Sequence, residues 1–168
     1  MRPVPEFGTI GLMPDSFDFA LLNAVQRDAA RTAESLANDV PLSPSAIARR
    51  LRRLRAEGII SRTIALLSPR LTERRLRAIV LIQLSEHADL KGKAALERAL
   101  NAADEVQLCY DIAGPHDMAA LFDCSSMAEF NAATGELLES APTVRRFETH
   151  FVKRELKFAP FVELGTEP

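Results

Sequence analysis

The sequence predicts an α+β protein with an N-terminal (winged) helix-turn-helix domain followed by a ferredoxin-like βαββαβ domain. Three observations support this prediction. Apolar residues repeat with a helical period in three short segments before Gly58, and elements follow as strand, helix, strand, strand, helix and strand after residue 77. The charge also changes sign between these parts. We expect an arm at 1–14, the helix-turn-helix domain with its wing at 15–67, a linker at 68–77, the second domain at 78–158 and a tail at 159–168.

The net charge of −2 hides this asymmetry. Residues 1–77 hold 13 Lys and Arg against 8 Asp and Glu, a net of +5, whereas the remainder holds 8 against 15, a net of −7. A basic part joined to an acidic part is typical of a polyanion-binding module attached to a domain that does not itself bind polyanions.

Composition excludes several classes of protein. Ordinary apolar and charged fractions in 168 residues exclude disorder, collagen and a disulfide scaffold. The longest apolar run, residues 78–84, is too short to cross a bilayer, so we expect a cytoplasmic protein. Cys109 and Cys124 have no second Cys or His at metal-ligand spacing, so we expect reduced packing residues and neither a metal nor a cofactor.

The first two helices are indicated by caps and by an apolar stripe. Residues 1–14 hold three prolines and two glycines without a usable period, which predicts a poorly ordered arm. Asp15 or Ser16 can cap a helix that ends near Asp28. Thr32 can cap a short second helix, and residues 39–42 form a tight connection to the third. The stripe of the first helix consists of Phe17, Leu21, Leu22 and Val25.

The third helix is the clearest element of the chain. Ser43 can cap its first turn, Pro44 suits the first helical position, and Gly58 can end it in the left-handed conformation. At 100° per residue one face is apolar, and the opposite face carries arginines. The apolar residues are Ile47, Leu51 and Leu54.

Five arginines among seven residues repel one another unless they meet a polyanion, and guanidinium groups suit phosphate oxygens and guanine edges. Taken alone, such a run is more often a solvated basic face. After two helices and a tight turn, the arrangement favours binding of double-stranded DNA. We predict base contacts from Arg49 and Arg52 and phosphate contacts near the helix N-terminus from Ser43 and Ser45. The residues predicted to contact the DNA backbone are Arg50, Arg53 and Arg62.

Two short segments after Gly58 predict the wing. Residues 59–60 and 63–67 are strand-like, and Ser61 and Arg62 can turn between them. The alternative is a plain extended linker. Residues 68–77 then form the joint between the domains.

The second domain has strands at 78–85, 106–113, 118–124 and 144–152, and helices at 90–102 and 126–138. Its first strand is apolar on both faces, because Val80, Ile82 and Leu84 point one way while Ile79 and Leu81 point the other. Two helices cover only one face of such a sheet. We therefore expect a second subunit on the other face and a two-fold dimer, which would present two helix-turn-helix units to DNA half-sites about one helical turn apart.

Several segments resemble the leucine-responsive regulator and asparagine-operon regulator (Lrp/AsnC, feast/famine) family of bacterial transcription factors, over roughly residues 15–157. Each segment is weak alone, and their order and separation are specific. They read DFALLNAVQRD, LSPS with RRLRRLRAEGII, TIALLSP, VQLCYDIAGPHDMAALF and GELLESAPTV.

The resemblance implies a DNA-binding regulator joined to an effector-binding domain, dimers through that domain, often octamers, and an amino acid or related metabolite as effector. It places effector contacts at Gly114, His116 and Asp117. The alternative for these residues is a hairpin turn whose polar side chains face water. The sequence departs from the family pattern at Pro41, where a glycine is common, and at Pro115, where an acid is usual. That acid would be a natural partner for a ligand ammonium group.

Two other functions remain open at this point. Relatives of this architecture resemble haem-pathway (sirohaem decarboxylase-like) enzymes, but no cluster of acid, histidine and nucleophile appears here, so we predict no catalytic residues. An architectural DNA-binding protein without an effector is the second alternative.

Overall fold

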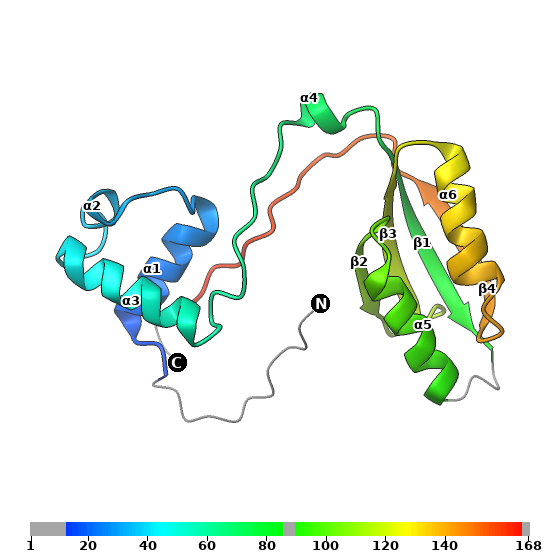
Figure 1. The fold of residues 1–168 in the computed structure, drawn as a ribbon, viewed down its shortest axis with the longest axis horizontal. Helices are drawn as coiled ribbons and strands as arrows, with labels where there is room; N and C mark the ends of the chain where they lie inside the picture. The colour runs from blue at the N-terminus through cyan, green and yellow to red at the C-terminus, as the bar shows by residue number, and fades with distance from the viewer. Residues whose placement is uncertain (1–12, 86–89, 166–168) are drawn as a thin grey trace. The chain divides into compact units, whose positions relative to one another are not determined.

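The computed structural model describes residues 13–85 and 90–165, so the predicted arm at 1–14 lies almost wholly outside the described residues. The chain forms two compact units (Figure 1). Of the described residues, one unit holds 13–66 and 157–165, and the other holds 67–85 and 90–156. The chain therefore crosses between the units twice.

The first unit contains the predicted three helices, α1 (Ser16–Arg27), α2 (Ala33–Leu36) and α3 (Pro44–Ala56). Asp15 caps α1 in a reciprocal capping box with Asp18, and Thr32 caps α2. The three helices bury one shared core, made of Leu21, Leu22, Leu36, Val40, Ile47, Leu51 and Leu54. Apolar burial on the predicted stripes therefore fixes the packing of this unit.

The turn before α3 forms without a left-handed residue, because no described residue other than glycine has a positive φ. The backbone N–H of Leu42 donates to the carbonyl of Val40 at 2.7 Å, which closes a three-residue turn around Pro41. The ring of proline holds φ near the value that the centre of an inverse γ-turn requires. A proline can therefore replace the glycine that is common in the family.

The predicted two-stranded wing is wrong for this structure. Residues 59–67 are extended but form no strand, and Ile64 and Leu66 are more than half exposed. A two-residue hairpin needs residues that accept positive φ, and Ser61 and Arg62 do not favour it. The alternative of an extended linker describes this segment.

The second unit follows the predicted strand and helix order after a short helix, α4 (Pro69–Thr72), in the linker. Its sheet has the order β2-β3-β1-β4, with every neighbouring pair antiparallel. This is the arrangement of a ferredoxin-like domain, which confirms the predicted fold class. The elements are β1 (Leu76–Leu84), α5 (Leu90–Ala102), β2 (Val106–Asp111), β3 (Met118–Cys124), α6 (Met127–Thr134), a π-helical turn η1 (Gly135–Glu139) and β4 (Val144–Phe151).

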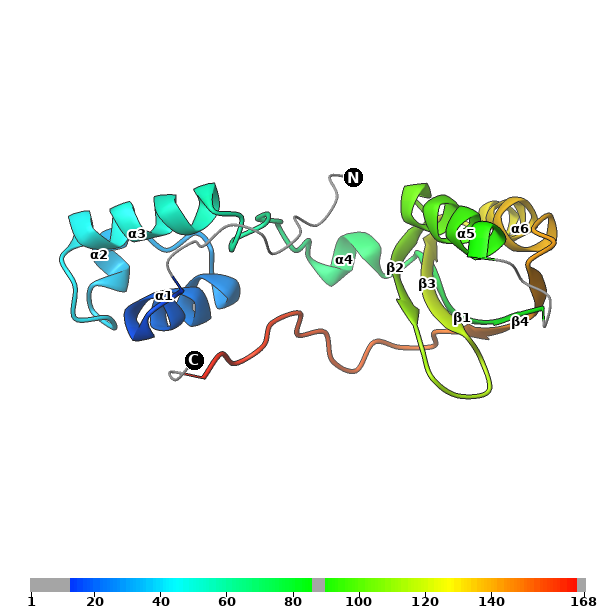
Figure 2. The ribbon, with the colours of Figure 1, turned by 90° about the horizontal axis from the view of Figure 1, so that it is seen from below.

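Both long helices of this unit, α5 and α6, cover one face of the sheet (Figure 2). Ala78, Val80 and Ile82 of β1 are fully buried against them. The opposite face is apolar at its centre, where Ile79 pairs with Leu121 of β3, and Ile79 is 45% exposed. The alternation predicted for β1 is therefore present, and residues 13–85 and 90–165 leave one apolar face of the sheet uncovered.

Candidate DNA and effector sites

The ends of α3 are set by the residues that the sequence indicates. The hydroxyl of Ser43 accepts a hydrogen bond from the Ala46 backbone N–H at 3.3 Å, and Pro44 occupies the first turn. Gly58 has φ +75°, the left-handed conformation that ends a helix at low cost for glycine. Helix α3 therefore begins and ends where the sequence predicts.

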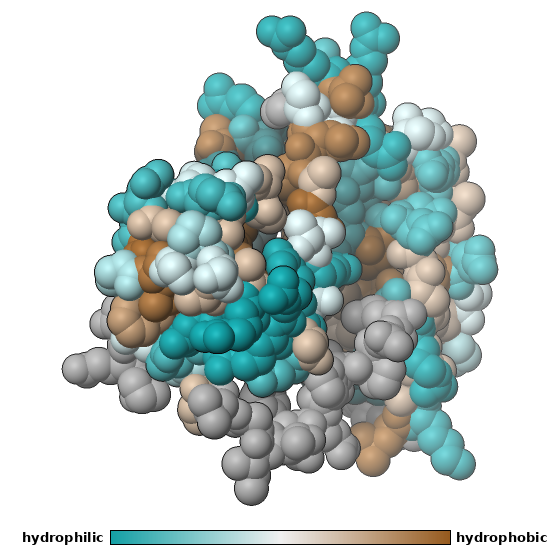
Figure 3. Space-filling view, turned by 60° about the vertical axis from the view of Figure 1, so that its left-hand side comes forward, coloured by the Kyte–Doolittle hydropathy of each residue, from teal (hydrophilic) through white to brown (hydrophobic). Residues whose placement is uncertain are grey.

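The predicted DNA-contacting residues divide into two groups. Ser43, Ser45, Arg49, Arg52 and Arg62 are exposed, and neither Arg49 nor Arg52 forms an ion pair with any described residue. Strongly hydrophilic side chains gather on the surface of this unit, in agreement with an exposed arginine-rich helix (Figure 3). These five residues are available to an external partner.

Arg50 and Arg53 instead contact the N-terminal end of α1. Arg50 Nη1 donates to Asp15 Oδ2 at 2.8 Å and to Asp18 Oδ1 at 2.9 Å, and Arg53 Nη2 donates to the other oxygen of Asp18. The Asp18 side chain is 1% exposed, so its charge needs these partners. These two arginines therefore fix α3 on α1, whatever they do with DNA.

The contacts between α1 and α3 shift the pKa values of Asp15 and Arg50. Burial acts to raise the pKa of Asp15, but hydrogen bonds from the Asp18 backbone N–H and from Arg50 outweigh it, so the pKa lies below its ordinary value. The hydrogen bonds that Arg50 donates to the carboxylates of Asp15 and Asp18 raise the pKa of Arg50. Because Asp15 is more acidic in the folded chain, its stabilising contribution is complete at neutral pH and is lost as pH falls toward the lowered pKa.

The predicted effector residues lie in the turn between β2 and β3. Gly114 has φ +150°, which a residue with a side chain rarely adopts. Asp117 faces the end of β1, where its carboxylate accepts a hydrogen bond from the Leu84 backbone N–H at 2.8 Å. The carboxylate of Asp117 is therefore partly committed to the fold.

The side chain of His116 in this turn is 11% exposed and lies beside β4. Its Nε2 has no hydrogen-bond partner among the residues that the structure describes, and it lies 3.4 Å from the Glu148 carboxylate of β4. The same carboxylate lies 3.7 Å from Arg146. The structure thus brings a histidine and a carboxylate together beside the turn that lacks the usual first acid of the family.

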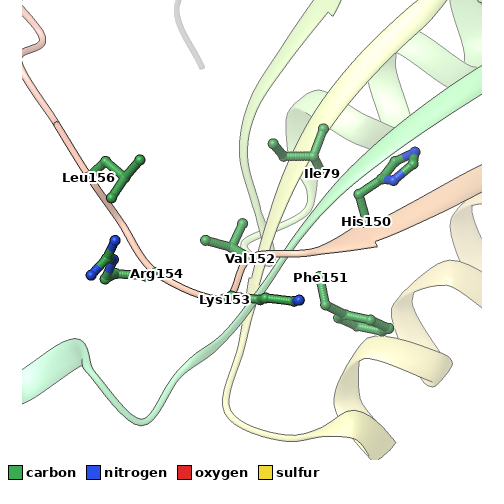
Figure 4. Close-up of a pocket in the computed structure, with 7 residues that line it drawn as sticks. All are labelled: Ile79, His150, Phe151, Val152, Lys153, Arg154 and Leu156. Atoms are coloured by element: carbon green, nitrogen blue, oxygen red, sulfur yellow. The ribbon is translucent and has the colours of Figure 1, made fainter.

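A shallow hollow of about 400 Å³ lies elsewhere on this unit, at the junction of β1 and β4 (Figure 4). Ile79 and His150 border it from the uncovered sheet face, and Lys153 and Arg154 border it beyond the end of β4. Because it contains none of the predicted effector residues, it is a separate feature of the unit.

Sequence reasoning missed Asp18 and Glu148. The signal for Asp18 was present, because an acid one turn before Leu21 and Leu22 lies on the buried side of α1. Arg50 and Arg53, also one turn apart, flank the apolar stripe of α3 and meet this acid. Glu148 had no comparable signal, since its proximity to His116 depends on the pairing of β4 with β1.

Residues 13–85 and 90–165 contain no helix of the length and apolarity needed to span a membrane. The same residues contain no group of three or more His, Cys, Asp or Glu side chains placed to hold a metal ion. Cys109 and Cys124 are free thiols, and burial raises the pKa of both.

Comparison with known proteins identifies both units. Residues 15–55 match the model of the AsnC-type helix-turn-helix domain, and residues 77–160 match the Lrp/AsnC ligand binding domain. An HTH-type transcriptional regulator of Sinorhizobium fredii is 33% identical over 153 residues, 89% of each chain. The leucine-responsive regulatory protein of Haemophilus influenzae is 32% identical over 154 residues, 89% of this chain and 90% of that one.

Solved structures agree with this assignment. A transcriptional regulator of Neisseria meningitidis, determined as a complex with L-Met, has a TM-score of 0.77 and 25% identity, and the match covers 91% of this chain and 97% of that one. Escherichia coli AsnC shares the fold with a TM-score of 0.73, 20% identity and coverage of 89% and 98%. The chain therefore belongs to the Lrp/AsnC family and is a DNA-binding transcriptional regulator with a C-terminal ligand-binding domain, not an enzyme.

Proposed function

We propose that α3 enters the major groove of double-stranded operator DNA, with Arg49 and Arg52 at base edges. The observation that carries this proposal is the division of the arginines. Arg50 and Arg53 are bound to α1, whereas Arg49 and Arg52 are exposed on the side of α3 away from the core. Exposed guanidinium groups on a rigid helix have the geometry for bidentate contact with guanine.

Phosphate contacts are proposed for residues at the start of α3 and just after its end. Ser43 and Ser45 lie at the N-terminus of α3, where backbone N–H groups favour an anion. Arg62 follows the helix and is exposed. Arg50 and Arg53 remain proposed backbone contacts, with smaller effects than a free arginine because Asp15 and Asp18 already neutralise part of their charge.

The effector is proposed to be an amino acid held beside the β2–β3 turn. The Neisseria relative was determined with L-Met, which supports this ligand class. Pro115 stands where the family usually has an acid, and Glu148 supplies a carboxylate beside His116. We propose that Glu148 accepts the ligand ammonium group and that His116 and the backbone at Gly114 contact the remainder.

Glu148→Gln is expected to weaken amino-acid binding about 10- to 100-fold, since a hydrogen bond to a charged group contributes roughly 1.5 to 3 kcal/mol. Isothermal titration calorimetry with a panel of amino acids measures this loss, with the exposed Asp104→Asn as the control. Equal affinities for the parent and Glu148→Gln would exclude this role for Glu148.

The uncovered sheet face is proposed to be the interface of a two-fold homodimer. Four such dimers are proposed to assemble into an octamer. Exposed Ile79 and Tyr110, with the half-buried Leu81, Ala119 and Leu121, provide the apolar surface that a second copy would cover. Such a dimer would present two copies of α3 to adjacent half-sites.

Ile79→Arg is expected to shift the protein toward monomers, because a dimer would then bury an unpaired charge on each side of the axis. Sedimentation velocity measures the shift. Leu90→Arg, at an exposed position of α5, is the control and is expected to keep the oligomeric state of the parent.

The function as a whole is tested by selecting genomic DNA fragments with the purified protein, with and without an amino-acid pool. We expect enrichment of fragments that share one operator motif and a changed enrichment when the effector is present. Uniform recovery of all fragments would instead favour an architectural protein. We propose that the regulator acts in the cytoplasm, where it meets chromosomal DNA.

A further inference from the structure

We propose that α1 carries a docking surface for an extended peptide segment, that its occupant is the chain's own segment Phe161–Leu164, and that the docked segment forms a clasp on the DNA-binding domain. The clasp consists of Phe161–Leu164 bound to Asn23, Gln26 and Arg27. It lies on a helix that does not contact DNA in the proposed function, so it goes beyond that function.

Two side-chain amides of α1 bind the backbone of the segment. Asn23 donates to the carbonyl of Leu164 and accepts from its N–H, both at 2.9 Å. Gln26, one turn later, donates to the carbonyl of Val162 at 2.5 Å and accepts from its N–H at 3.0 Å. Each amide thus pairs with both backbone groups of one residue, as a neighbouring β-strand would.

The spacing of these contacts matches an extended chain. Val162 and Leu164 are two residues apart, so their N–H and C=O groups point toward the same side of an extended backbone. Asn23 and Gln26 are three residues apart and lie on one face of α1. Four hydrogen bonds with this regularity are the mark of backbone recognition rather than of an incidental contact.

Side chains set the register of the segment. The Arg27 guanidinium lies 4.5 Å from the centre of the Phe161 ring and pairs with the Glu163 carboxylate at 2.5 Å. Leu164 packs against the core of the helix-turn-helix domain and is partly buried. The Arg27–Glu163 pair is more than half exposed and contributes little free energy, so the amide bonds and Leu164 supply most of the binding.

The chain's own segment is favoured as occupant because it is already tethered. It follows β4 after a short extended stretch, residues 152–160, and a tether of this length gives an effective concentration on the order of millimolar. At this effective concentration, a contact of modest intrinsic affinity is formed in most of the molecules. Residues 59–75, which precede β1, make the first connection between the two units, and the clasp makes a second one through which the effector domain restrains the DNA-binding domain.

Amide hydrogen exchange in the full-length protein tests the docking. In the parent we expect the N–H groups of Val162 and Leu164 to exchange at least about 10-fold more slowly than that of Glu163, because only the first two donate to α1. Asn23→Ala with Gln26→Ala is expected to abolish this difference, whereas Asn38→Ala, at an exposed turn, is expected to keep it. Core amides of α1 and α3 serve as the check that the domain stays folded.

Equal exchange at the three positions in the parent would overturn the proposal, as would alternating protection that survives the double substitution. The occupant is tested by mixing isotope-labelled double variant with unlabelled parent under conditions that exchange subunits. Continued loss of protection supports the chain's own segment. Recovered protection would show that the segment docks on another copy and would overturn this choice of occupant.

The restraint is tested by nitrogen-15 relaxation of α1–α3. The double variant is expected to show a shorter local correlation time for this domain than the parent and the Asn38→Ala control. Identical correlation times would overturn the role of the clasp as a connection between the domains.

Discussion

Replacing Arg49 or Arg52 with alanine is expected to lower affinity for the selected operator by about 1 to 3 kcal/mol each, roughly 5- to 150-fold, and to relax the base preference at one position. Both side chains are exposed on α3, whose opposite face is held by the buried residues Ile47, Leu51 and Leu54. A truncated side chain leaves a base edge without its partner, while the helix itself remains in place.

Fluorescence anisotropy with the operator and with single-base variants of it, at several salt concentrations, measures this effect. Arg98→Ala on α5 removes the same charge from an exposed position of the other domain and is expected to leave the affinity unchanged. An affinity and base preference equal to those of the parent in both Arg49→Ala and Arg52→Ala would exclude base contact by these residues.

Arg53→Ala provides the contrast within the same helix. As a backbone contact it would weaken all DNA sequences alike and reduce the salt slope by about one. Because Arg53 also binds Asp18, the substitution is expected to lower the stability of the domain as well. A measured loss of stability without loss of DNA affinity would assign Arg53 to the fold alone.

Asp18→Ala is expected to lower the free energy of unfolding of the helix-turn-helix domain by about 2 to 3 kcal/mol. Asp18 is almost fully buried, receives hydrogen bonds from Arg50 and Arg53, and completes the capping box of α1. Removing one partner of a buried ion pair commonly costs roughly 3 to 5 kcal/mol. We expect a smaller loss than this common cost because the side chains of Arg50 and Arg53 remain 22% and 29% exposed and can recover some hydration.

Hydrogen exchange of amides in α1 and α3 reports this loss for the domain itself, independently of the unfolding of the other domain. Glu34→Gln, at an exposed position of α2 in the same domain, is the control and is expected to change stability by less than about 0.5 kcal/mol. A loss in Asp18→Ala no larger than in this control would show that the ion pairs do not stabilise the packing of α3 on α1.

The local elements of this protein were largely predictable from sequence. Ser43, Pro44 and Gly58 delimit α3, and the alternation of apolar residues in β1 identifies the buried face of the sheet, because caps and periodicity act over a few residues. The wing was the exception. Residues 59–67 have strand-forming composition, but pairing also needs a turn that Ser61 and Arg62 do not favour.

The sites were only partly predictable. The sequence placed seven residues on a DNA-binding surface, and their contacts with DNA remain predictions. It separated Arg49 and Arg52, opposite the apolar stripe, from Arg50 and Arg53, which flank it. It did not show that Arg50 and Arg53 bind carboxylates of α1, because that depends on how α1 packs against α3. For the effector turn, sequence gave Gly114, His116 and Asp117 but not Glu148, which reaches His116 from a strand 32 residues later.

By itself, the sequence determined the family, the order of elements, the ends of the recognition helix and the division of charge, because each of these depends on residue types at short separations. Tertiary structure decided three other features: which arginines are free for a partner, which carboxylate stands beside His116, and where the C-terminal segment docks. Asn23 lies 141 residues before Leu164, and only the folded chain brings them within 2.9 Å. Such contacts depend on backbone groups and on burial of a few side chains, neither of which leaves a periodic pattern in the sequence.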